Sequence, residues 1–147
     1  EAEEFLNSYF LKFPEIKDYM ENTIKFCRKS GYVNNIFGRK THIMGINDKN
    51  FNVRNFQERA AINAPIQGSA SELMRLAMIR LNKKIYEKKN QNLKILLQIH
   101  DELIFEVPKI EIEKISELVK FEMENAVKLS VPLKVDYNWG VSWYDAH

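Results

Sequence analysis

Cysteine is nearly absent from this chain, in which Cys27 is the only one among 147 residues. A single cysteine excludes an intramolecular disulfide framework and a cysteine-rich zinc site, and it fits a reducing, cytoplasmic setting. Long apolar runs are also lacking, because none approaches the roughly 20 residues needed to span a bilayer. No secretory signal opens the sequence. We therefore expect a cytoplasmic protein without a membrane partner.

Net charge is low as well, at +2, and by itself it says nothing about nucleic acid. The chain contains no internal repeat and no low-complexity segment. The chain as a whole is 45% hydrophobic and 29% charged, which is typical of a globular protein rather than a disordered one. A length of 147 residues corresponds to one domain that is large enough to bury a core.

Charge is distributed unevenly along the sequence. Between residues 28 and 59 there are seven lysines and arginines against two acids, whereas residues 106–124 contain six glutamates against three lysines. A basic middle and an acidic later segment indicate one face for a polyanion and another for solvent. Ordinary scatter of charge over a solvated surface explains the same counts equally well.

Apolar periodicity divides the chain into helices and strands. It predicts helices at 1–12, at 14–30 with Pro14 in the first turn and Gly31 after the last, at 56–87 with a kink or restart near Pro65, and at 111–128. The remaining elements are a small hairpin or irregular loop at 32–44, a hairpin at 93–107, a strand at 133–138 and a packed aromatic tail from 139 onward. The fold class is α+β, with a small antiparallel sheet and helices packed on one face.

The hairpin predicted at 93–107 has a polar centre formed by His100, Asp101 and Glu102. Buried unpaired carboxylates cost several kcal/mol, so these residues must lie at the hairpin tip. Two acids and an imidazole at a rigid strand end suit a divalent metal or a phosphate, and a solvated turn is the plainer alternative. Because successive side chains on a strand point to opposite faces, the two acids can share a site only at a turn. Even there the set is incomplete, because Mg²⁺ takes oxygens from several elements.

A second candidate is the stripe formed by Arg59, Asn63 and Gln67, which follow one another at intervals of four residues on a predicted helix. Arginine makes bidentate contacts to phosphates or bases, and the two amides offer one donor and one acceptor each. A groove of duplex nucleic acid is a natural target for this stripe. A solvated helix face and a hydrogen-bonded seam between helices are the alternatives.

Two longer segments resemble one family. Residues 58–70 (ERAAINAPIQGSA) look like the helix near the finger–palm junction of family A DNA polymerases, and residues 98–107 (QIHDELIFEV) look like the palm hairpin of that family, its motif C. Their order and separation match too, and the resemblance covers essentially the whole chain. The departures are mild: Ser69 replaces a commoner threonine, and Ile99 precedes the histidine where valine is common.

The resemblance implies roles for individual residues. Asp101 matches the motif C aspartate, a ligand of two catalytic Mg²⁺ ions, and Glu102 matches the neighbouring glutamate that supports the metal site less directly. His100 matches a histidine near the primer terminus. The residues that match contacts to the template–primer duplex are Arg59, Asn63 and Gln67, with Arg54 as a weaker match near the template strand.

The resemblance also implies what the chain lacks. The other palm aspartate of the family has no counterpart here, nor does the fingers helix that grips the incoming deoxynucleoside triphosphate. The chain therefore looks like a C-terminal part of a polymerase, with residues 1–67 in the fingers and residues 68–147 in the palm. The sequence leaves its oligomeric state open.

These inferences predict a parent protein that is a DNA-directed DNA polymerase of replication or repair. It would extend a primer from dNTPs with two Mg²⁺ ions. The isolated 147 residues are expected to be inactive, which makes a non-catalytic nucleic-acid-binding module the main alternative. A metal-dependent phosphohydrolase built on His100, Asp101 and Glu102 is a weaker one, since it lacks further ligands.

Overall fold

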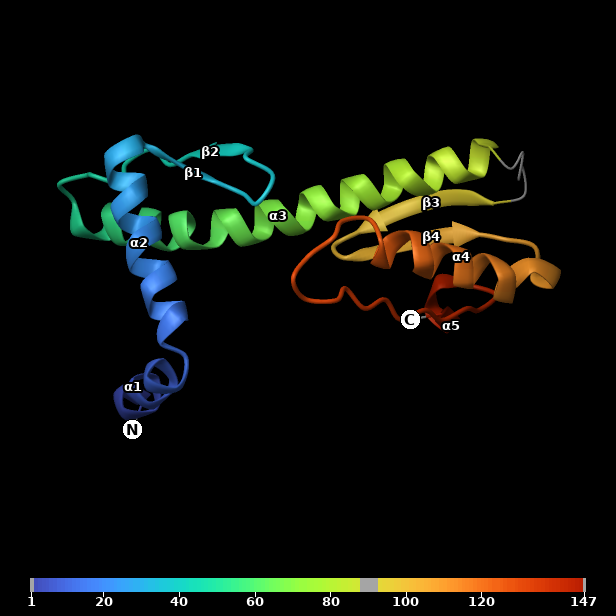
Figure 1. The fold of residues 1–147 in the computed structure, drawn as a ribbon, viewed down its shortest axis with the longest axis horizontal. Helices are drawn as coiled ribbons and strands as arrows, with labels where there is room; N and C mark the ends of the chain where they lie inside the picture. The colour runs from blue at the N-terminus through green and yellow to red at the C-terminus, as the bar shows by residue number, and fades with distance from the viewer. Residues whose placement is uncertain (1, 88–92, 147) are drawn as a thin grey trace. The chain divides into compact units, whose positions relative to one another are not determined.

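The computed structural model describes residues 2–87 and 93–146, whose helices and strands are labelled in Figure 1. The chain divides into two compact units, Glu1–Ala70 and Ser71–His147, and one long helix contributes to both. The assignment of fingers to residues 1–67 and palm to residues 68–147 stays a prediction. Within the described ranges no helix is both long and apolar enough to cross a membrane.

The first unit begins with helices α1 (Ala2–Lys12) and α2 (Pro14–Ser30). Pro14 occupies the first turn of α2, where its missing N–H costs nothing. Gly31 ends the helix in the left-handed conformation, with φ of 77°, and donates its N–H to the carbonyl of Cys27 at 2.8 Å. Both predicted boundaries of α2 are therefore confirmed.

A short antiparallel hairpin follows, formed by β1 (Tyr32–Asn34) and β2 (Lys40–His42). Since side chains alternate along a strand, Val33 faces inward and is only 2% exposed, while its neighbours face outward. The core of this unit comprises Cys27, Val33, Ile43, Ile46 and Ala61.

Helix α3 (Phe51–Glu87) is longer than the sequence predicted and begins five residues earlier than residue 56. The reason is a cap at Asn50, whose side-chain oxygen accepts the N–H of Asn52 at 2.9 Å and whose carbonyl accepts the N–H of Arg54 at 3.0 Å. The helix also continues through Pro65 as one element, so the predicted restart there is wrong.

The second unit contains the hairpin β3 (Lys94–Ile99) and β4 (Glu102–Glu106), as the sequence predicted. A bulge falls between Ile95 and Leu97. The 3₁₀ turn η1 (Lys109–Glu111) leads into α4 (Ile112–Glu124), which ends before the predicted residue 128. Leu81 of α3 and Ile115 and Val119 of α4 meet in one core with the hairpin, and Figure 1 shows α4 lying along it.

The predicted strand at 133–138 does not form. Burial still alternates along this segment, because Leu133 and Val135 are half-buried while Lys134 and Asp136 are exposed. A strand also needs a second strand whose backbone forms hydrogen bonds with it. Here the backbone N–H of Val135 donates instead to a side chain, the Glu124 carboxylate, at 3.0 Å. The described residues therefore form two separate two-stranded sheets, not one sheet of three strands.

The aromatic tail is also less packed than expected. It forms the short helix α5 (Trp143–Ala146), and Trp139 and Tyr144 are 64% and 91% exposed. Hydrophobic composition alone therefore misjudged how deeply this tail is buried.

Candidate functional site

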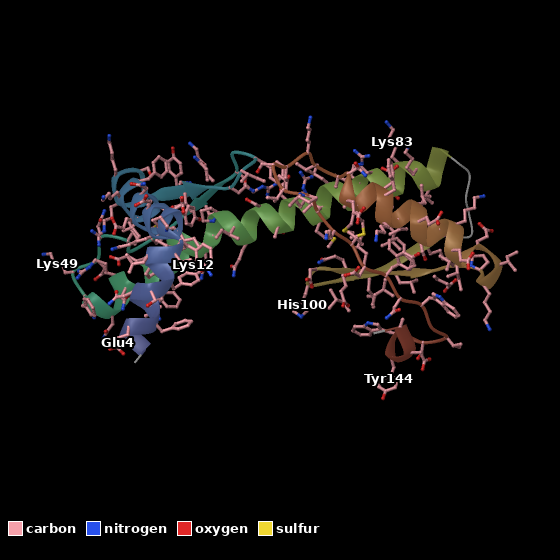
Figure 2. All side chains as sticks on the ribbon, turned by 60° about the horizontal axis from the view of Figure 1, so that its bottom comes forward. Glu4, Lys12, Lys49, Lys83, His100 and Tyr144 are labelled. Carbon is pink, nitrogen blue, oxygen red and sulfur yellow. The ribbon has the colours of Figure 1, made fainter. Side chains whose placement is uncertain are left out.

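The polar centre of the second hairpin lies at its tip, as predicted. Ile99 pairs with Glu102 to close the strands, which leaves His100 and Asp101 as the two turn residues. Figure 2 shows His100 at this free end. Both turn residues are exposed and Glu102 is half-buried, so the tip presents His100 and Asp101 to solvent.

The backbone at His100 is strained. Its φ of 50° is the only positive value among the described non-glycine residues. A positive φ at the first central residue of a two-residue hairpin loop is usually taken by glycine, and a larger residue there costs about 1–3 kcal/mol. Gln98 supports the turn by donating its side-chain amide to the carbonyl of His100 at 2.7 Å. Strain of this kind is often found at functional sites.

The carboxylates at the tip do not by themselves complete a site for a divalent metal ion. Asp101 and Glu102 are hard oxygen donors of the kind that Mg²⁺ prefers. Within residues 2–87 and 93–146, however, no three His, Cys, Asp or Glu side chains lie close enough to hold a metal ion. Asp136, an acid in the segment that the sequence predicted to be a strand, is exposed and lies outside any helix or strand. Further ligands would have to come from another part of the protein.

The polar stripe lies in the first unit, on the exposed face of α3. Arg59, Asn63 and Gln67 are all exposed, whereas Ala61 and Ser69 on the opposite face are buried. In the described part of the chain no hydrogen bond or ion pair engages the three stripe side chains. They do not form a seam between helices, so their donors and acceptors remain available to a ligand.

Arg54 differs from the stripe because it takes part in a local network. Its Nη1 donates to the carbonyl of Asp48 at 3.0 Å, its Nε lies 4.0 Å from the Glu58 carboxylate, and its guanidinium lies 5.6 Å from the centre of the Phe51 ring. Glu58 also pairs with Arg28. These contacts fix the first turns of α3, so a contact between Arg54 and DNA would compete with them.

Sequence reasoning missed the polar groups behind the stripe. The hydroxyl of Tyr19 donates to the carbonyl of Ile62 at 2.9 Å, and Asn35 donates its amide to the carbonyl of Gly68 at 3.2 Å. Burial raises the pKa of the Tyr19 hydroxyl above its ordinary value. Pro65 predicted a kink or restart in the helix, but nothing in the sequence pointed to these two hydrogen bonds.

Comparison with known proteins identifies the class to which this hairpin and helix belong. The model of DNA polymerase family A matches residues 1–145, so the chain belongs to that family. The resemblance seen in the two sequence segments is thereby confirmed.

Individual relatives agree. DNA polymerase I of Caldicellulosiruptor bescii is 49% identical over 145 residues, which are 99% of this chain and 17% of that protein. DNA polymerase I of Bacillus subtilis is 47% identical over 146 residues, which are 99% of this chain and 16% of that protein. The chain thus spans about a sixth of the length of these relatives.

A solved structure shows the same fold. The POL domain of Pol1 from M. smegmatis, in complex with a DNA primer-template and dNTP, matches with a TM-score of 0.93 and 40% identity. The match covers 99% of this chain and 26% of that one. This confirms the mixed α+β fold class.

Proposed function

We propose that this chain is part of a DNA-directed DNA polymerase that extends a primer on a template from dNTPs. The observation that carries the proposal is the family match over residues 1–145, which includes the hairpin tip of His100, Asp101 and Glu102. The solved relative, which holds primer-template and dNTP, supports the same substrates.

Within that reaction we assign the tip to the catalytic centre. The Asp101 carboxylate holds Mg²⁺ and Glu102 supports the metal site less directly, with further ligands from outside this chain. Bound Mg²⁺ supplies positive charge that stabilises the transferring phosphoryl group. His100, held on the strained turn, lies against the primer terminus.

We assign the stripe to the duplex. Arg59 contacts phosphate or a base edge, and Asn63 and Gln67 offer amide donors and acceptors to the same strand pair. Arg54 contributes near the template strand once it leaves its contacts with Asp48 and Glu58. The free donors of the stripe support this assignment, because an unpaired polar stripe on a rigid helix is preorganised for a ligand.

The catalytic assignment is tested by replacing Asp101 in the polymerase that contains this chain. We expect Asp101→Asn to lower primer extension by about a thousandfold while the affinity for primer-template stays within about twofold. Asp136→Asn is the matched control, because it makes the same change at an exposed acid outside the hairpin. Near-normal extension by Asp101→Asn would contradict the assignment.

For the isolated 147 residues, a non-catalytic nucleic-acid-binding module is the second candidate. The incomplete carboxylate set and the free stripe favour it. We expect the isolated chain to bind primer-template without extending it, and a primer-extension assay on this chain decides between the two. Extension by the isolated chain would show that the tip needs no further acid.

A further inference from the structure

The exposed stripe and the buried face of α3 share one short segment around Pro65. Asn63 and Gln67 project to solvent from one side, while Ser69 on the other side is only 8% exposed. The orientation of the two amides therefore depends on the contacts that the buried side of this segment makes.

Pro65 weakens the helix at this point. It has no N–H, so the carbonyl of Ala61 loses its partner in the helix, and the proline ring crowds that carbonyl as well. Such a change usually bends or breaks a helix, yet α3 continues through it. Two side-chain hydrogen bonds, one on each side of the proline, support the helix at this point.

Two hydroxyl groups hold the helix, one from a neighbouring element and one from α3 itself. On the N-terminal side of Pro65, Tyr19 of α2 donates to the carbonyl of Ile62 at 2.9 Å, and Ile62 directly precedes Asn63. On the C-terminal side, Ser69 donates to the carbonyl of Pro65 at 2.5 Å. The first bond ties the helix to α2 next to one stripe residue, and the second closes the turn that contains Gln67.

The Ser69 hydroxyl is held in place by the β1–β2 loop. Its oxygen accepts the N–H of Ile36 at 3.1 Å, and the Asn35 amide donates to the carbonyl of Gly68 at 3.2 Å. Asn35 is itself fixed, because its side-chain oxygen accepts the N–H groups of Phe37 and Arg39 at 3.0 and 2.9 Å. The segment is thus anchored on both sides of Pro65 by buried or half-buried groups.

We propose that Tyr19 and Ser69 are positioning residues for duplex binding, which act by fixing the Pro65 segment so that Asn63 and Gln67 meet the DNA in one orientation. This inference rests on the proposed function and adds to it two groups that do not themselves touch DNA. A helix with a proline gap can rotate or fray there, and the two hydroxyls remove that freedom before DNA binds.

The test uses Tyr19→Phe in the polymerase that contains this chain, with primer-template affinity measured by fluorescence anisotropy. We expect the Kd to rise about threefold to fivefold, while kcat at saturating DNA stays within about twofold, because the reacting groups are untouched. Tyr9→Phe is the matched control. It removes a hydroxyl of the same unit that has no hydrogen bond in the described structure and keeps the ring contacts with Phe10 and Phe13.

Coupling to the stripe separates positioning from general destabilisation. In an Asn63→Ala background, Tyr19→Phe should have no more than about half its effect on Kd, because much of what it positions is gone. An equal loss of affinity in both backgrounds would overturn the inference, and so would an unchanged Kd for Tyr19→Phe alone. If Asn63→Ala itself leaves the Kd unchanged, the proposed role of the stripe in DNA binding is wrong, and so is the inference that rests on it.

Ser69 offers a rescue experiment. Ser69→Ala removes the hydroxyl and should raise the Kd about threefold or more, whereas Ser69→Thr keeps the hydroxyl and should restore an affinity within twofold of the original. Thermal unfolding of both variants shows whether each is folded at the assay temperature. A Ser69→Thr protein that is folded and binds as weakly as Ser69→Ala would contradict a role for the hydroxyl.

Discussion

Arg80 on α3 holds Glu122 on α4 through two hydrogen bonds, in which its Nε and Nη2 donate to the same carboxylate oxygen at 3.0 and 2.9 Å. The two side chains differ sharply in exposure, at 42% for Arg80 and 4% for Glu122. The pair therefore ties two helices of the second unit together while it compensates a buried negative charge.

This difference in burial predicts that substituting Arg80 and substituting Glu122 lower the free energy of unfolding by different amounts. Arg80→Ala leaves the Glu122 carboxylate buried without its partner, and we expect a loss of about 3 kcal/mol in the free energy of unfolding. Glu122→Gln leaves Arg80 free to turn toward water and should cost about 1 kcal/mol. Urea denaturation of the three proteins measures both values. A larger loss for Glu122→Gln than for Arg80→Ala would show that the carboxylate is better solvated than its burial indicates.

The strained turn at His100 predicts that a substitution can raise the stability of the protein while it lowers its activity. His100→Gly relieves the positive φ and should raise the free energy of unfolding by about 1 kcal/mol relative to His100→Ala, which keeps the strain. Both variants lose the imidazole, so both should lower primer extension in the whole polymerase. Thermal unfolding and extension assays on the pair separate the two effects. Equal stability of the two variants would show that the turn is not strained.

The stripe on α3 predicts different salt dependences for its charged and neutral members. Affinity for duplex DNA falls as salt concentration rises. Arg59→Ala should make the slope of log affinity against log salt concentration less negative by about 1, because one phosphate contact is lost. Asn63→Ala should weaken binding without changing the slope. Lys17→Ala is the control, since Lys17 is an exposed cation on α2 without a partner in the described structure. A change in slope as large for Lys17→Ala as for Arg59→Ala would contradict a specific contact.

The parts of the fold that the sequence predicted well are those fixed by local chemistry. Pro14 and Gly31 bound α2 because each residue has only a few favourable backbone conformations, and these do not depend on distant contacts. The β3–β4 hairpin was predicted for a similar reason, since a polar centre between apolar runs leaves only a turn for the charged residues.

The errors arose where distant groups decide. Pro65 predicts a kink or restart, yet α3 continues through it, and next to this point Tyr19 of α2 donates to the carbonyl of Ile62. The alternation at 133–138 predicts a strand, yet a strand forms only where a second strand offers its backbone. The position of His100, Asp101 and Glu102 was predictable, but the positive φ of His100 was not, because a polar tripeptide between two apolar runs does not specify the type of turn.

Cys27 provides a probe of the first unit that is independent of DNA. Its side chain has no exposed surface, and burial raises the pKa of its thiol. Both effects suppress the reactive thiolate in the folded state. We expect the reaction with a disulfide reagent to be at least about a thousandfold slower in the folded chain than in denaturant, since it requires opening of the unit. A rate within tenfold of the denatured chain would show that the core around Cys27 opens freely.

The raised pKa of the Cys27 thiol also sets a pH dependence with a definite sign. Below the ordinary value of 9.0 the thiol is protonated in both states, and its contribution to stability is complete. As pH rises above that value the unfolded chain ionises first, which lowers the free energy of unfolding until the folded thiol ionises too. The stability gap between the original chain and Cys27→Ala should therefore be constant from pH 7 to about 8 and shrink above about pH 9. Urea denaturation of both proteins across this range measures the gap, and a gap that widens above pH 9 would contradict burial of the thiol in the folded core.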